Sequence, residues 1–66
     1  MTFNIGDIVW WGKPYGSRSD KREREYGYID GLNPERESVY ITAFKDLDKF
    51  TLLIQDLEAG YWGPVE

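Results

Sequence analysis

The sequence has no cysteine and no histidine, and it has no run approaching the roughly 20 apolar residues of a membrane helix. Without cysteine no disulfide can form, and without both residue types the usual ligands of structural zinc are missing. The same absence excludes the Ser-His and Cys-His pairs of nucleophilic catalysis. The N-terminal stretch MTFNIGD has neither the basic start nor the apolar core of a signal peptide. We therefore predict a cytoplasmic, non-enzymatic protein with no membrane segment, metal site or cofactor.

Two pairs of carboxylates are the remaining candidates for chemistry. Asp46 with Asp48, or Asp56 with Glu58, could serve as a general acid and base. Such residues in short turns are more often solvated or capping groups, and calcium needs about six to eight oxygen ligands, more than a D-L-D tripeptide supplies. The stretch GKPYGSRS also lacks the spacing of a phosphate-binding loop. Binding by the protein surface is the function that these exclusions favour.

The short chain is rich in aromatic residues. Its 66 residues predict a single domain, 1–66, and a chain of this size buries only about 60% of the surface that its unfolded form exposes. Phe, Trp and Tyr make up 17% of the sequence, and each such ring can bury about 150–250 Å². We expect an aromatic core, with some rings left on the surface because so small a core cannot enclose them all.

Charge is distributed unevenly along the chain. The protein has a net charge of -4, but the segment from Lys13 to Glu25 has five basic and three acidic residues, a balance of +2. The rest of the chain therefore carries -6. A segment of nearly balanced charge in an acidic protein favours a solvated, adaptable rim over a basic arm for nucleic acid.

Alternating apolar residues and turn signals predict five short strands. A helix over 20–26 would be short and lack an apolar stripe, and the spacing over 42–57 fits a period of 2 better than 3.6. A polar loop starts at Gly12 and continues through the charged segment, and KDLDK connects a hairpin. The predicted strands are 5–11, 25–32, 39–44, 50–55 and 61–65, with a single 3₁₀ turn over 56–60.

The alternation also predicts which side chains face the core. Gly27 and Gly31 are expected to mark a bend, a bulge or a close backbone approach in their strand. The first strand leaves two inward pairs open: Ile8 with Trp10, or Val9 with Trp11. In the later strands the inward residues are expected to be Val39, Ile41, Ala43, Phe50, Leu52 and Ile54.

Three short motifs carry a resemblance to a known fold: IGDIV from Ile5, GYI from Gly27 and QDLE from Gln55. With the strand layout, they make the chain similar to SH3-like small β-barrels of the KOW and Tudor-like bacterial type over nearly its whole length. The resemblance implies an all-β fold, a single five-stranded SH3-like barrel with a long loop after strand 1 and a 3₁₀ turn before the last strand. The chain lacks the ALYDY-like stretch and paired tryptophan of signalling SH3 domains, which argues against polyproline recognition.

Two functions remain open. The first is a protein-interaction module, an adaptor, small subunit or inhibitor, that binds a protein partner through exposed aromatics and the charged loop. The alternative is a KOW-type barrel that contacts RNA or single-stranded DNA, although such barrels are generally basic. A third interpretation is that the rings only wrap a thin core. The oligomeric state is left open, since an edge strand over 61–65 could pair with another chain. The residues expected at the partner surface are Trp11, Arg22, Arg24, Tyr26, Tyr28, Tyr40 and Phe44.

Overall fold

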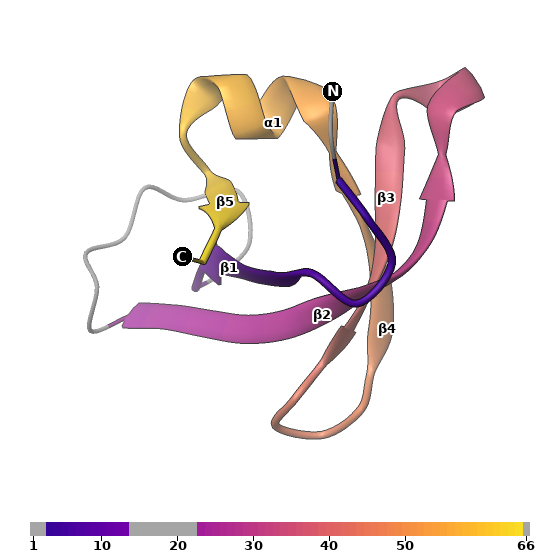
Figure 1. The fold of residues 1–66 in the computed structure, drawn as a ribbon. Coiled ribbons are helices and arrows are strands. Elements are labelled where there is room, and N and C mark those ends of the chain that lie inside the picture. Colours follow the sequence, from indigo (N-terminus) through magenta and orange to yellow (C-terminus); the bar gives the residue numbers. More distant parts are fainter. Residues whose placement is uncertain (1–2, 14–22, 66) are drawn as a thin grey trace.

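The computed structural model describes residues 3–13 and 23–65, which form one five-stranded antiparallel sheet in the order β4-β3-β2-β1-β5 (Figure 1). The all-β prediction is confirmed, and so are the five strands and the long connection after the first one. The strands are β1 (Ile8–Gly12), β2 (Arg24–Asn33), β3 (Ser38–Ala43), β4 (Lys49–Leu53) and β5 (Trp62–Pro64).

The long strand β2 joins the two halves of the sheet. Its first half pairs with β1 and its second half with β3, and the register shifts between Ile29 and Gly31, where a bulge interrupts the ladder. Figure 1 shows β2 running beneath β1 and β5 and then turning upward beside β3 and β4. The bend expected from Gly27 and Gly31 is therefore confirmed, and it lets the two halves face each other across the core.

The sheet curls but does not close into a complete barrel. Within the described residues β4 and β5 share no ladder; instead the indole Nε1 of Trp62 donates a hydrogen bond to the carbonyl of Leu53 at 2.7 Å. This bond connects β5 to the end of β4. In the sequence the same two strands are connected by the helix that lies between them.

The core collects side chains from every strand. Of the two inward pairs that the sequence left open for the first strand, the structure buries Val9 and Trp11. The inward orientation predicted for β3 is confirmed, and Phe50 is the one predicted core residue that is only partly buried. The buried apolar residues are Val9, Trp11, Ile29, Val39, Ile41, Ala43, Leu52, Ile54 and Trp62.

A short α-helix, α1 (Ile54–Ala59), replaces the 3₁₀ turn predicted over 56–60, so that prediction is wrong in type and in starting point. The helix begins where the β3–β4 pairing ends: the Ile54 N–H donates to the carbonyl of Glu37 at 2.9 Å, one step beyond the Leu53–Ser38 pair in the same register. Gly60 ends it in the left-handed conformation (φ 89°), which glycine adopts without steric cost. No helix in the described part of the chain is long and apolar enough to cross a membrane.

A 3₁₀ helix, η2 (Pro34–Arg36), forms at the corner between β2 and β3, where an Asn-Pro pair favours a turn. Proline occupies the first helical position, where its missing N–H costs nothing, and the Asn33 side chain accepts a hydrogen bond from the Arg36 N–H at 3.4 Å. Asn33 thus caps the corner that joins β2 to β3.

The predicted hairpin between β3 and β4 is confirmed, and its turn contains a strained residue. Leu47 has a φ of 61°, a conformation that costs a side chain other than glycine or asparagine about 1–2 kcal/mol, and its side chain is 67% exposed. We expect Leu47→Asn to raise the free energy of unfolding by about 0.5–1 kcal/mol, because asparagine tolerates this conformation and little packing is lost. Urea denaturation would measure the change, and a loss of stability would contradict it.

Candidate functional site

The outer face of β1 and β2 carries large side chains in register. Successive residues of a strand point to opposite faces, so with Val9 and Trp11 inward, Ile8 and Trp10 point outward. The antiparallel register places Ile8 opposite Tyr28 and Trp10 opposite Tyr26. Directly opposite side chains in a ladder are near enough to pack together. Two adjacent cross-strand pairs therefore cover this part of the sheet.

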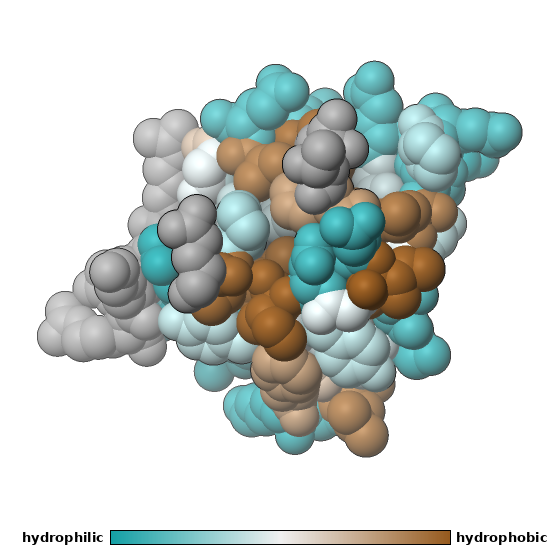
Figure 2. All heavy atoms as spheres, viewed as in Figure 1, coloured by the Kyte–Doolittle hydropathy of each residue, from teal (hydrophilic) through white to brown (hydrophobic). Residues whose placement is uncertain are grey.

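The residue that follows β3 extends this surface. The Phe44 N–H donates to the carbonyl of Tyr26 at 3.0 Å, and the Phe44 ring lies 5.9 Å from the ring of Tyr28, centroid to centroid. Tyr26 is 41% exposed and Phe44 is 50% exposed. Figure 2 shows apolar side chains gathered across the middle of the viewed face, in front of β1 and β2, and continuing toward the β3–β4 hairpin.

An arginine is stacked on this aromatic surface. The guanidinium carbon of Arg24 lies 3.7 Å from the centroid of the Trp10 ring, well within the range of a cation–π contact. The Arg24 Nε is buried and has no hydrogen-bond partner among the described residues, so its environment on this side is the aromatic face of Trp10. We call the set of Ile8, Trp10, Arg24, Tyr26, Tyr28 and Phe44 the outer patch.

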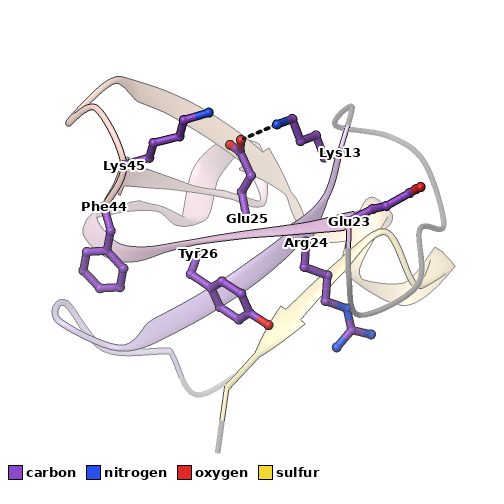
Figure 3. Close-up of a pocket in the computed structure, with 7 residues that line it drawn as sticks. All are labelled: Lys13, Glu23, Arg24, Glu25, Tyr26, Phe44 and Lys45. Atoms are coloured by element: carbon purple, nitrogen blue, oxygen red, sulfur yellow. Dashed lines mark ion pairs between the residues drawn. The ribbon is translucent and has the colours of Figure 1, made fainter.

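A cavity of about 520 Å³ adjoins the outer patch at the start of β2 (Figure 3). On its other side the Lys13 Nζ lies 3.6 Å from an Oε of Glu25, an ion pair exposed to solvent. Such exposed pairs contribute about 0–1 kcal/mol, so this one constrains the cavity wall only weakly. The cavity is lined by Lys13, Glu23, Arg24, Glu25, Tyr26, Phe44 and Lys45.

Four of the residues predicted for the partner surface come together in the outer patch: Arg24, Tyr26, Tyr28 and Phe44. Trp11, also predicted there, lies in the core instead; it is 2% exposed and its ring meets Phe50 edge to face with centroids 5.0 Å apart. Alternation along β1 is the reason, since Val9 and Trp11 share the inward face. Arg22 lies outside the described residues.

Tyr40 is exposed but lies apart from the outer patch. Its hydroxyl accepts a hydrogen bond from Asn33 Nδ2 at 3.0 Å. A polar cluster on β2, β3 and β4 lies between it and Tyr28: an Asp30 carboxylate oxygen accepts from the Thr42 hydroxyl at 3.4 Å and pairs with Lys49 Nζ at 3.2 Å. Tyr40 therefore belongs to a different part of the same sheet face.

Sequence reasoning missed Ile8 and Trp10 as surface residues. The signal was present in the alternation of IVWW, which puts one tryptophan on each face, but the sequence did not show which one. Both alternations of this stretch are apolar, so only the pairing of β1 with its neighbours shows that Trp10 lies on the outer face, opposite Tyr26 and against Arg24.

The described residues offer no group of three histidine, cysteine or carboxylate side chains close enough together to hold a metal ion. The outer patch itself has one cation and five apolar or aromatic groups, a composition suited to contact with another molecule's surface. Comparison of the chain with protein-family models, curated proteins and solved structures finds no match. The resemblance to SH3-like barrels therefore stays a prediction that rests on this chain's own residues.

Proposed function

We propose that this chain is a small, non-enzymatic protein-interaction module of SH3-like type, which binds a protein partner through the outer patch. The observation that carries the proposal is the contiguity of the patch: two cross-strand pairs, the Tyr28–Phe44 ring contact and the Arg24–Trp10 stack join six residues on one face. Trp, Tyr, Phe and Arg are the residues enriched at protein interfaces and at their energetic centres. Scattered rings would have favoured a purely structural role.

The energetics of the patch also suit a protein partner. Rings with few rotatable bonds lose little conformational entropy when they become buried, and contiguous exposed apolar patches often mark binding sites. Arg24 is already held against Trp10 in the free protein. Binding therefore loses less side-chain conformational entropy than it would if this arginine were mobile.

Nucleic acid is the alternative partner, and aromatic rings on a sheet face are one observation in its favour. Charge argues against it. The protein has a net charge of -4, and two of the lysines near this face are in ion pairs, Lys13 with Glu25 and Lys49 with Asp30. Each phosphate contact changes the slope of log affinity against log salt concentration by only about 0.7–0.9. A surface with one stacked arginine and one lysine would therefore bind nucleic acid weakly at physiological salt.

A pair of tyrosine variants tests the proposed function. Tyr26 and Tyr40 are 41% and 44% exposed, both lie in strands, and only Tyr26 belongs to the outer patch. We expect Tyr26→Ser to weaken capture of the partner about 10-fold or more, as removal of a central interface aromatic typically does. Tyr40→Ser should capture it as the unmodified protein does. Affinity capture followed by quantitative mass spectrometry would compare the three proteins.

Two outcomes would contradict the proposed function. In one, both variants capture the same proteins in the same amounts as the unmodified chain, while their melting temperatures show that they are folded. In the other, single-stranded RNA shifts the amide signals of Arg24, Tyr26 and Tyr28 at physiological salt, which would assign the patch to nucleic acid.

A further inference from the structure

The 520 Å³ cavity lies along the edge of β2 and not over one face of the sheet. Side chains of neighbouring strand residues point to opposite faces, yet both Arg24 and Glu25 line this cavity. Figure 3 shows Arg24, Tyr26 and Phe44 on one side of the strand, and Lys13, Glu25 and Lys45 on the other. A hollow that reaches both sides of a strand must lie at its edge. Strand β1 occupies one edge here, so the cavity lies at the other.

The backbone at this edge is available for pairing. The β2–β3 ladder begins only at Gly27, and the hydrogen bond from the Phe44 N–H to the Tyr26 carbonyl is the last connection between the two segments. The N–H and C=O groups of every second residue point to the same edge, so those of Arg24 point the same way as the Tyr26 carbonyl. No strand in the described part of the chain pairs with Arg24 on this side.

The charges around the cavity indicate what could pair there. Lys45, on the side of β2 away from the aromatic rings, is in no ion pair among the described residues, and neither is Arg24. Lys13, on the same side as Lys45, is neutralised by Glu25. The other side of the edge is formed by the rings of Tyr26 and Phe44 and by Arg24, whose guanidinium is stacked on Trp10. An extended chain lying in the cavity would thus meet a free cation on one side and aromatic rings on the other.

We propose that the edge of β2 at Arg24, next to the Phe44–Tyr26 hydrogen bond, accepts an extended segment of the protein partner as an added strand, with acidic side chains toward Lys45 and apolar side chains against Tyr26 and Phe44. Strand addition of this kind obtains affinity from main-chain hydrogen bonds and specificity from alternate side chains. The inference rests on the proposed function, because it names the kind of segment that the outer patch and its adjoining edge bind.

Three synthetic nonapeptides test the added strand. One alternates valine and glutamate, the second alternates valine and glutamine, and the third is the glutamate peptide with N-methyl groups on all its backbone nitrogens, so that neither of its edges can donate a ladder hydrogen bond. Titrated into the ¹⁵N-labelled protein at 50 mM salt, the glutamate peptide should shift the amide signals of Arg24, Tyr26 and Phe44. It should bind about threefold to tenfold more tightly than the glutamine peptide, as exposed charge pairs allow. The N-methylated peptide should not bind, since it cannot complete the ladder.

A pair of lysine variants provides the control. Lys45→Gln and Lys49→Gln change the net charge equally, but only Lys45 lines the cavity. Lys45→Gln should remove the preference for the glutamate peptide, and Lys49→Gln should keep it. Equal binding of the N-methylated peptide, shifts that avoid all three amides, or no shift at millimolar peptide would each overturn the proposal.

The two proposals can fail separately. If Tyr26→Ser abolishes partner capture while Lys45→Gln and the peptides have no effect, the outer patch binds a partner by its face and the strand-addition inference is wrong. If the protein alone forms a dimer in sedimentation experiments through this edge, the occupant is a second copy of the chain, and the inference about a partner segment is again wrong.

Discussion

Gly27→Ala is expected to destabilise the protein by about 2–3 kcal/mol, in the range of overpacking substitutions in well-packed sites. A Cβ atom at this position would overlap the backbone carbonyl oxygen of Thr42 and press on the Trp11 ring and the Ala43 Cα, at 3.0 and 3.1 Å. Two of these neighbours are backbone, and Trp11 is buried, so none can move cheaply. A 66-residue domain has a total stability of about 3–10 kcal/mol, so the loss is a large part of it.

Gly31→Ala is the matched control, on the same strand but beyond the bulge, where the position faces the exposed side of the sheet. Its Cβ would approach only the exposed ring of Tyr40, at 3.1 Å, and that ring can turn toward solvent. We expect a change within about 0.5–1 kcal/mol, as for surface substitutions. Urea denaturation of both variants would compare them. Equal losses at the two positions would mean that the close approach at Gly27 does not determine its effect.

Much of the fold could be predicted because its strands obey local rules. Alternation identifies the inward residues of β3, and the glycines of β2 indicate its bend, since both features depend only on the chain near them. The position of Pro64 is predictable in the same way: a residue without an N–H suits the edge strand β5. These elements needed no knowledge of the rest of the molecule.

The misassigned residues depend on contacts between segments far apart in the sequence. Trp10 and Trp11 are adjacent and identical, and only the pairing of β1 with β2 and β5 decides which one is buried. The helix α1 starts where it does because Ile54 bonds to Glu37, 17 positions earlier. Tyr40 shares a sheet face with the patch, but the cluster of Asp30, Thr42 and Lys49 that separates them arises from three different strands.

The candidate site illustrates the same division. The sequence identified Arg24, Tyr26, Tyr28 and Phe44 as surface residues through alternation and the surplus of aromatics. It could not show that Arg24 stacks on Trp10, because that contact follows from the register that brings Arg24 opposite Gly12. A binding surface built across strands is visible in a sequence only as its separate parts.

Trp62→Ala is the second substitution with a large expected effect. Trp62 is 1% exposed, its ring lies 5.4 Å from that of Phe3, and its Nε1 donates the bond to Leu53 that connects β5 to the end of β4. Truncating a buried aromatic costs about 3–5 kcal/mol, which is between about a third and all of the 3–10 kcal/mol expected for a domain of this size. Trp62→Phe should lose less, about 1–3 kcal/mol, because it keeps a ring but loses the hydrogen bond from Nε1 to the Leu53 carbonyl.

Trp10→Ala should affect binding without unfolding the protein. Trp10 lies in β1, the strand that pairs with β5, but it is only partly buried and faces outward. We expect it to cost about 1 kcal/mol, the value of its cation–π contact with Arg24 and some packing, and to leave the protein folded. Partner capture should nevertheless fall as it does for Tyr26→Ser.

Circular dichroism melts and capture assays on the two tryptophan variants would therefore give different patterns. Trp62→Ala should lose capture because it is destabilised, and Trp10→Ala should stay folded but fail to bind. If Trp10→Ala captured its partner normally, the Arg24–Trp10 stack would be structural, and the binding energy would have to come from Tyr26, Tyr28 and Phe44 alone.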